Sequence, residues 1–466
     1  MAMALPAASN QVLIFSCASC SSSGSPGAYL ATSCSISQGF PGFTKTSGVD
    51  PEVDANGAVN TESAFLQQSG SYWTITLDTS LLTQGSYYVL CADMDGGPTS
   101  GQPDSNPLKI GETVEVYITS IQSLQTDVIL AALNQHISFT CQSCDATTEM
   151  YLADACDTSA YGSVVAITGS RTASVAIESG VFPAWEVVLD ASTLAGGRDY
   201  RLCVDQDGNK TVQRGGDAQL SVTVSGLLFV SESSVLPGPS QVLSLQCSAL
   251  GGCTSGTSKL YLAKSCDTTI STGIVSASGE DYSSSFVMTG SGTNFFATVN
   301  TSRLQPGRHY KVCADIDGVG DLRMVDSLQE VYISPVFAGH PKLEGPWPSV
   351  LRASGQALSF NCPSCSNVSE GWLGEDCGNA TDPNILRTPS FSLQGEGSSW
   401  VLPIDATPLT SGESYYLCLD LDGDGVDLRP GNALSTLIYV SAVNSVQPAF
   451  VDGASGQTVH VGCLEG

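Results

Sequence analysis

Apolar and polar residues alternate with a period of two through much of this chain, which is the pattern of β-strands with one buried face. In the opening segment NQVLIFSC, Leu13, Phe15 and Cys17 share one face. Three later segments repeat this row with Ile137, Phe139 and Cys141, with Leu243, Leu245 and Cys247, and with Leu358, Phe360 and Cys362. We therefore predict that the first cysteine of each segment points into a hydrophobic core.

A later strand in each segment carries an aromatic residue on the same face as aliphatic residues. Its first example is Trp73, Ile75 and Leu77. The matching rows are Trp185, Val187 and Leu189, then Phe295, Ala297 and Val299, then Trp400, Leu402 and Ile404. A row of exposed aromatic rings would suit sugar stacking, but the shared aliphatic face favours packing in a core.

These segments recur in a fixed order, so the chain is a repeat array. The openings NQVLIFSCASC, NQHISFTCQSC, SQVLSLQCSALGGC and GQALSFNCPSC start four units, and GQTVHVGCLEG starts the pattern again. The period of about 100 residues is the size of a β-sandwich. The predicted domains are repeats 1 to 4, at 1–120 with an incomplete first strand, 121–226, 227–335 and 336–443, and then the first strands of a fifth repeat at 444–466. The segments between units are expected to form first strands, which would couple neighbours stiffly.

Each unit resembles an immunoglobulin-like β-sandwich, with an early cysteine, a core tryptophan and a tyrosine just before a late cysteine. The resemblance implies an all-β fold of tandem immunoglobulin-like domains. The units depart from the family at one point, because Tyr88, Tyr200, Tyr310 and Tyr415 stand three residues before the late cysteine and not two. In repeat 1, Tyr88 and Leu90 then face inward and Cys91 outward. A cross-strand bridge on the outer face is therefore as compatible with the sequence as the usual inter-sheet disulfide.

The cysteines form four groups of four, with Cys463 left over as an unpaired or intersubunit thiol. The groups are Cys17, Cys20, Cys34 and Cys91; Cys141, Cys144, Cys156 and Cys203; Cys247, Cys253, Cys266 and Cys313; and Cys362, Cys365, Cys377 and Cys418. Four cysteines allow three pairings, and we favour pairing of the last cysteine, outside the core, with the third or the second. Disulfides in this number predict a secreted or cell-surface protein.

Zinc is the alternative use of these cysteines, because CASC, CQSC and CPSC have the CxxC spacing of zinc knuckles. Five residues separate Cys247 from Cys253, however, and no second CxxC follows in any unit. A thioredoxin-like redox pair is disfavoured because each CxxC ends a strand instead of opening a helix.

Charge narrows the classes of partner. The 466 residues include 17 Lys and Arg against 45 Asp and Glu, a formal net charge of -28, which repels nucleic acid and anionic membranes. No apolar run approaches the ~18 residues of a membrane span. The opening MAMALPAASN does not read as a signal peptide, which leaves a removed leader or a window on a longer polypeptide as alternatives.

Acidic residues recur after the late cysteine of each unit. They are Asp93 and Asp95, Asp205 and Asp207, Asp315 and Asp317, and Asp420, Asp422 and Asp424 with Asp427 nearby. Alternate carboxylates before a glycine suit calcium, although the later Glu and flanking helices of an EF-hand are missing. The other interpretation is that Asp and Gly simply form the turn that follows the strand.

No catalytic constellation recurs. The four histidines occupy different places in the repeats, and GxSxG, HExxH and phosphate-loop motifs are absent from the sequence, so we predict no enzyme and no required cofactor. N-glycan acceptor triplets begin at Asn209, Asn300, Asn367 and Asn379, all in predicted loops or turns. Covalent glycans are therefore expected.

An acidic, cysteine-rich, glycosylated array of this kind resembles the subunits of algal or protist surface filaments such as flagellar hairs (mastigonemes). The resemblance implies a structural subunit that self-associates into an extracellular filament. One expected route is head-to-tail assembly, in which the strand around 444–463 docks on the first domain of the next subunit; the alternative is a window cut from a longer array. The competing function is a calcium-dependent or carbohydrate-binding adhesin, with surface glycans as partners.

Overall fold

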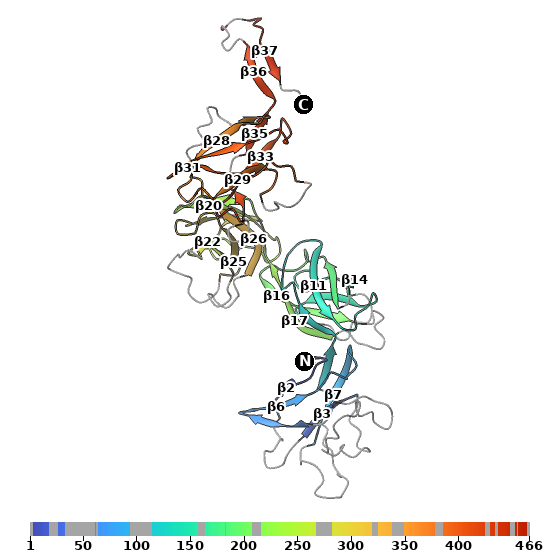
Figure 1. Ribbon diagram of the computed structural model, residues 1–466. Helices are drawn as coiled ribbons and strands as arrows, with labels where there is room; N and C mark the ends of the chain where they lie inside the picture. Colours follow the sequence, from blue (N-terminus) through green and yellow to red (C-terminus); the bar gives the residue numbers. More distant parts are fainter. Residues whose placement is uncertain are drawn as a thin grey trace, which may run out of the picture. The chain divides into compact units, whose positions relative to one another are not determined.

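The computed structural model of the chain is built from β-strands (Figure 1). It describes residues 3–17, 27–32, 61, 64–93, 114–156, 164–181, 183–206, 216–266, 282–318, 325–337, 349–377, 385–424, 429–433, 437–447, 453 and 455–463. Within these ranges there is no helix, and so none that could cross a membrane. The chain divides into two compact units, Met1–Ser225 and Gly226–Gly466.

The first unit contains two sandwiches. Repeat 1 holds β1 (Met3–Pro6), β2 (Gln11–Phe15), β3 (Gly27–Ala31), β4 (Ala64–Phe65), β5 (Gln67–Ser69), β6 (Tyr72–Leu77), β7 (Ser86–Asp93) and β8 (Glu115–Thr119). Repeat 2 holds β9 (Ile121–Leu124), β10 (Val128–Leu130), β11 (Gln135–Cys141), β12 (Glu149–Ala153), β13 (Val175–Ala176), β14 (Glu178–Val181), β15 (Ala184–Leu189), β16 (Arg198–Asp205) and β17 (Gly216–Ser225).

The second unit contains two more sandwiches and a hairpin. Repeat 3 holds β18 (Leu227–Val230), β19 (Ser234–Val235), β20 (Gln241–Cys247), β21 (Lys259–Ala263), β22 (Phe286–Val287), β23 (Thr289–Ser291), β24 (Asn294–Val299), β25 (His309–Asp315) and β26 (Val325–Ile333). Repeat 4 holds β27 (Ser349–Leu351), β28 (Gln356–Asn361), β29 (Glu370–Gly374), β30 (Phe391–Ser392), β31 (Gln394–Glu396), β32 (Ser399–Ile404), β33 (Ser414–Asp420), β34 (Gly431–Asn432) and β35 (Ile438–Ser441). The hairpin is β36 (Val443–Gln447) with β37 (His460–Cys463).

The strand order is that of an immunoglobulin-like sandwich, as repeat 2 shows in full. One sheet has the order β14-β15-β11-β9, and the other has the order β10-β17-β16-β12-β13. The first strand is split between the sheets, because β9 pairs antiparallel with β11 whereas β10 pairs parallel with β17. The predicted fold class, an all-β chain of tandem immunoglobulin-like domains, is confirmed.

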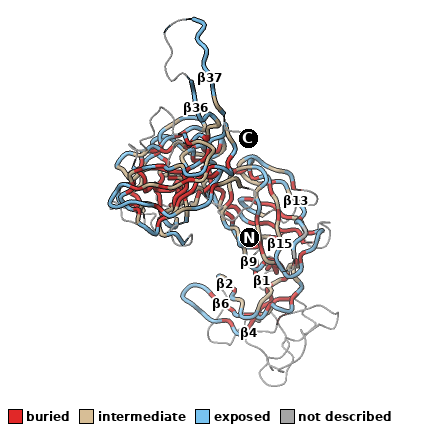
Figure 2. The backbone as a smooth tube through the Cα atoms, turned by 45° about the horizontal axis from the view of Figure 1, so that its top comes forward, coloured by how far each residue is buried: buried red, intermediate tan, exposed pale blue. Residues whose placement is uncertain are grey.

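The alternation of buried and exposed residues follows the period-two pattern (Figure 2). Cys141, Cys247 and Cys362 are fully buried, as predicted for the first cysteine. Trp73, Phe295 and Trp400 are also in the core. Trp185 differs, because it is only partly buried in β15, opposite Phe139 of β11.

A buried tyrosine fixes the start of the strand that carries each late cysteine. Its hydroxyl accepts a hydrogen bond of 2.8 to 2.9 Å from a backbone N–H five residues upstream; the pairs are Tyr88 with Thr83, Tyr200 with Ala195, Tyr310 with Gln305 and Tyr415 with Thr410. This is the tyrosine corner of immunoglobulin-like domains. Because the tyrosine faces the core, the cysteine three residues later faces away from it.

Candidate functional site: the junctions between repeats

Two kinds of disulfide fasten repeats 2 to 4. The short kind joins the first and second cysteines over three or six residues: Cys141–Cys144, Cys247–Cys253 and Cys362–Cys365. The long kind joins the third and fourth cysteines over 41 or 47 residues: Cys156–Cys203, Cys266–Cys313 and Cys377–Cys418. These twelve sulfurs are bonded to one another and offer no thiolates, so the four-cysteine zinc alternative is wrong for these repeats.

The remaining cysteines lie in repeat 1 and in the hairpin. Cys17 and Cys91 are disulfide-bonded, whereas Cys20 and Cys34 lie outside the described residues. Cys463 in β37 is exposed and free. The hairpin that carries it is largely exposed along both strands.

The long disulfides lie on the outer face of the sheet. In repeat 2, Cys203 and Cys156 pack with Tyr151, Ala153 and Val164 in a small cluster of their own, and Tyr151 stands directly opposite Cys203 in the strand register. The bridge therefore joins β16 to the segment that directly follows its neighbour β12 in the same sheet. It replaces the inter-sheet disulfide of antibody domains, in agreement with the outward direction of the late cysteine.

In the first unit the chain passes from one sandwich to the next without a linker, and in the second unit Val336, three residues after the end of β26, already packs in the core of repeat 4. Strand β8 ends at Thr119 and β9 begins at Ile121, which is buried in repeat 2. The Ile121 N–H donates to Thr119 Oγ1 at 3.1 Å, and the matching bond in the second unit runs from Val336 N–H to Ser334 Oγ at 3.1 Å. In both cases a hydroxyl side chain accepts the hydrogen bond of a backbone N–H at the point where the chain enters the next sandwich.

A tyrosine of repeat 1 packs closely against a glycine of repeat 2. Tyr117 is 1% exposed, and a Cβ atom added to Gly216 would stand 2.3 to 2.5 Å from its ring carbons. The ring also lies 5.0 Å from that of Tyr87 across the strand pair. Gly216 opposes Val204 within the sheet of repeat 2, so the tyrosine covers the backbone of that sheet.

The second unit repeats this contact between repeats 3 and 4. Tyr332 is 1% exposed, and a Cβ on Gly431 would stand 2.2 to 2.5 Å from its ring. The Tyr332 hydroxyl donates to the carbonyl of Leu419, the strand partner of Gly431, at 3.2 Å. Burial raises the pKa of Tyr332, with smaller contributions from Asp420 and Asp422, so the phenol stays protonated and remains a donor.

Polar groups surround the Tyr332 contact. His309 Nε2 lies 3.0 Å from the Pro430 carbonyl and must donate, because a carbonyl only accepts. Burial lowers the pKa of His309, which keeps the imidazole neutral near pH 7. Arg429 Nη2 donates to Glu330 Oε2 at 2.7 Å in a solvent-exposed ion pair.

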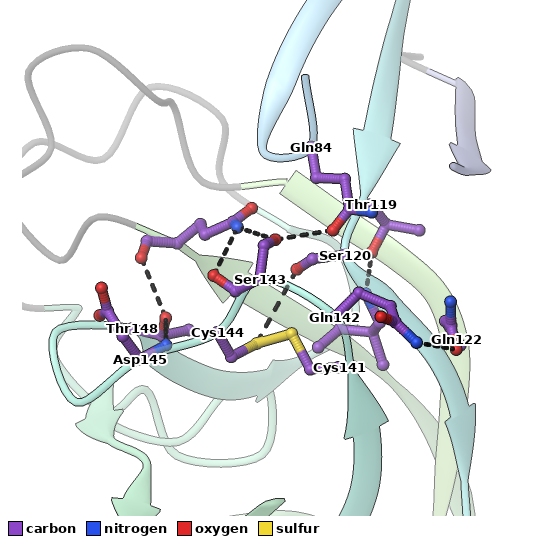
Figure 3. Close-up of a disulfide and its surroundings, with 12 residues drawn as sticks. Gln84, Thr119, Ser120, Gln122, Cys141, Gln142, Ser143, Cys144, Asp145 and Thr148 are labelled. Atoms are coloured by element: carbon purple, nitrogen blue, oxygen red, sulfur yellow. Dashed lines mark hydrogen bonds between the residues drawn. A yellow bond between two sulfur atoms is a disulfide. The ribbon is translucent and has the colours of Figure 1, made fainter. Parts of the chain in front are cut away.

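The short disulfide of repeat 2 supports the edge of the first junction (Figure 3). It closes the turn that carries Ser143, whose hydroxyl donates to Gln84 Oε1 of repeat 1 at 2.6 Å. Gln206 Nε2 donates to the Ser143 carbonyl at 3.0 Å, and Ser120 Oγ lies 3.9 Å from Cys144 Sγ. The CxxC turn thus makes a second contact of repeat 2 with repeat 1, beside that of Gly216 with Tyr117.

The acidic residues form turns where they are described. Asp315 Oδ1 accepts from the Gly318 N–H at 2.8 Å and Asp420 Oδ1 from the Gly423 N–H at 3.0 Å, and both glycines have positive φ. Burial, followed by the hydrogen bond with Asp317, raises the pKa of Asp315 to about 6. This geometry matches the turn interpretation.

Calcium ligation by these turns stays a prediction. In the part of the chain that the structure describes, which includes Asp205, Asp317, Asp422 and Asp424, no group of three or more acidic, His or Cys side chains could hold a metal ion. Asp93 lies in β7, and Asp95, Asp207 and Asp427 lie outside the described residues.

Two of the four glycan acceptors can be placed. Asn367 is exposed, and Asn300 is half-buried in a turn where its Oδ1 accepts from the backbone N–H and hydroxyl of Ser302 at 3.1 and 2.6 Å. Those bonds use the amide oxygen, whereas a glycan attaches to the nitrogen. Asn209 and Asn379 lie outside the described residues.

No known protein family matches the chain, and neither does any curated protein. Among solved structures, it is similar to the extracellular region of plexin A4, with 8% identity over 94% of this chain and 47% of that one and a TM-score of 0.17. It is also similar to the I9–I11 tandem of titin (9%, 69% and 98%, TM-score 0.14) and to a marsupial T cell receptor (11%, 64% and 95%, TM-score 0.18). The chain spans less than half of the plexin structure. At these TM-scores the fold assignment rests on strand order alone.

The junction tyrosines and glycines were not among the residues that the sequence singled out. Their signal is present, because EVYI occurs in repeats 1 and 3 and an Arg-x-Gly triplet ends at Gly216 and Gly431 in repeats 2 and 4. Treating all four repeats as equivalent conceals this alternation.

Proposed function

We propose that the chain is a structural subunit of an extracellular, glycosylated filament or surface appendage built from immunoglobulin-like repeats in series. The observation that carries the proposal is the passage from sandwich to sandwich without a linker, with a buried tyrosine at the boundary. A boundary of this kind resists bending, which a rod needs and a flexible string of domains does not.

Three further features support this function. The disulfides suit an oxidising environment outside the cell, and the long bridges lie where they do not interrupt the core. Asn367 is available for a glycan on the surface. A net charge of -28 keeps such chains soluble until specific contacts assemble them. That the filament is of the mastigoneme type is a proposal that rests on the repeat architecture alone.

Electron microscopy of the material secreted by the native source tests this function. We expect helical or fibrous order with an axial repeat, together with intersubunit contacts identified by cross-linking mass spectrometry. Discrete monomers without periodic order would overturn the filament proposal.

The calcium-dependent or carbohydrate-binding adhesin stays a prediction without a supporting observation among the described residues. A chelator separates the two functions. Loss of cell attachment with filaments left intact would favour the adhesin, whereas unchanged attachment would count against a calcium-dependent adhesin.

A further inference from the structure

The two boundaries with a buried tyrosine carry corresponding residues at matching positions. An aromatic ring stands opposite the tyrosine in the strand register, Tyr87 opposite Tyr117 and His309 opposite Tyr332. A glutamate precedes each tyrosine by two positions, and a glycine of the following repeat receives the ring. The interval between the tyrosines equals the interval between the glycines, so the pattern recurs once every two repeats.

Repeats 2 and 4 carry different residues at the tyrosine position. In repeat 2 the position is held by Thr223, whose hydroxyl donates at 2.6 Å to Asp199 of the same repeat. In repeat 4 it is held by Tyr439, which stands opposite Ser414 and is 41% exposed. Repeats 1 and 3 therefore carry a buried tyrosine on this face, whereas repeat 2 carries a threonine and repeat 4 an exposed tyrosine.

The glycine that receives the tyrosine ring is found in repeats 2 and 4, the repeats that lack the buried tyrosine. Gly216 and Gly431 oppose Val204 and Leu419, and the residue of repeat 3 in this register is Val325, opposite Ala314. Neither glycine has the positive φ that would demand glycine for backbone reasons. The requirement comes from the tyrosine ring, which leaves no room for a Cβ atom.

We propose that the outer face at the end of repeats 1 and 3 is an interaction surface specific for the glycine-bearing strand of repeats 2 and 4. Tyr117 or Tyr332 is the anchor of this surface, and the glycine is its socket. The array is therefore assembled from two-repeat modules, 1 with 2 and 3 with 4. This inference goes beyond the proposed function and holds whether or not the chain forms filaments.

Replacing the socket glycine tests the proposal, because the expected effect on stability is opposite to the usual effect of Gly→Ala. In a strand, Gly→Ala normally stabilises, because alanine loses less backbone entropy on folding. If Gly431 receives the Tyr332 ring, Gly431→Ala in the full chain will instead speed amide hydrogen exchange at least tenfold in both β26 and β33. Slower or unchanged exchange in these strands would overturn the proposal.

The tyrosines provide a matched comparison. Tyr332→Ala is expected to speed exchange at least tenfold in repeat 3 and in repeat 4, whereas Tyr439→Ala, the same change at the equivalent exposed residue, should alter neither by more than twofold. An effect of Tyr332→Ala confined to repeat 3 would show that the residue serves its own sandwich only, and would contradict the module.

A double variant ties the two residues together. Without the ring, the added methyl group meets no obstacle, so Gly431→Ala should no longer speed exchange in a Tyr332→Ala background. Additive effects would refute the direct contact. If Tyr332→Ala fails to fold, Tyr332→Phe keeps the ring and loses only the bond to Leu419, and Gly431→Ala must then retain its full effect.

Discussion

Asp315 shows how a single carboxyl group can set a pH dependence in repeat 3. The residue is 5% exposed, and its carboxylate caps the turn at Gly318 and has a pKa raised to about 6 by burial and by Asp317. A carboxyl whose pKa is higher in the folded than in the unfolded state stabilises fully below the unfolded value of 3.8 and loses that contribution as pH rises through about 6.

Asp315→Asn should therefore stabilise the repeat at pH 7.5 by about 1 kcal/mol and have almost no effect at pH 4. The asparagine oxygen can still accept from Gly318, so the turn is kept. Thermal unfolding followed at both pH values checks this. A variant that is equally or less stable at pH 7.5 would contradict a raised pKa for Asp315.

His309 acts in the opposite direction. Burial lowers its pKa below 6.5, so its contribution is present above pH 6.5 and is lost as pH falls through the lower folded value. The charged groups facing it are Glu330 and Arg429, and Tyr332 covers one side of the ring. Acidification is therefore expected to loosen the contact between repeats 3 and 4.

His309→Tyr introduces the residue that repeat 1 carries at this place, Tyr87, and removes the titrating group. The difference in melting temperature between variant and parent should grow in favour of the variant as pH falls below 6.5. Taking the difference cancels the Asp315 contribution, which both proteins share. A difference that is constant from pH 7.5 to 5 would exclude His309 as the sensor.

The roles of the turn aspartates and of the junction tyrosines could not be predicted from the sequence, for a physical reason. The aspartates were recognisable as calcium ligands or turn formers, but only the backbone decides which oxygen meets the Gly318 N–H. Tyr117 was one apolar residue in a β-branched strand, and its partner Gly216 lies in another repeat. Strand periodicity describes a residue's own sheet and says nothing of a neighbouring domain.

At the scale of elements, the disulfides should differ in their contribution to stability. A chain-entropy argument assigns about 4 kcal/mol to a loop of 47 residues and about 2 kcal/mol to a loop of six. In repeat 3, Cys266→Ala with Cys313→Ala should therefore destabilise by about twice as much as Cys247→Ala with Cys253→Ala.

Denaturant unfolding of the two double variants measures this difference. The short bridge starts at Cys247, which is fully buried in the core, so that variant also loses some packing. If the short-loop variant is the more damaged of the two, local packing and not loop closure dominates the effect of these bridges.

The strands and their inward faces were predictable because burial imposes a period of two on the sequence. Tyr88, Leu90 and Ala92 lie in the core as the alternation requires. The sequence left two partners open for the fourth cysteine, the third and the second, because spacing does not tell which of them the fold brings beside it. In repeat 2 the partner is the third cysteine, Cys156, just past the end of β12. The alternation was a poorer guide to burial in β15, where Trp185 stands at an inward position but is only partly buried.

At the scale of the whole molecule, disulfides act within repeats, whereas non-covalent contacts join repeat 1 to repeat 2 and repeat 3 to repeat 4. Each of repeats 2 to 4 is closed by its own disulfides, and the boundary inside each unit is closed by a tyrosine and a glycine. The sequence predicted serial domains and stiff coupling. It did not predict that neighbouring repeats would be paired, because that information lies in differences between repeats.

The long disulfide, whose late cysteine follows the tyrosine corner by three residues, also determines how the molecule responds to tension. In repeats 2 and 3 the bridge between the third and fourth cysteines closes a loop of 47 residues, and a force applied along the chain cannot extend that loop. At about 3.4 Å per residue, each bridge withholds about 160 Å of contour length. Single-molecule pulling should show unfolding steps that lengthen by this amount after reduction. Repeats 2 to 4 thus each carry a covalent limit on their own extensibility, whatever the strength of their cores.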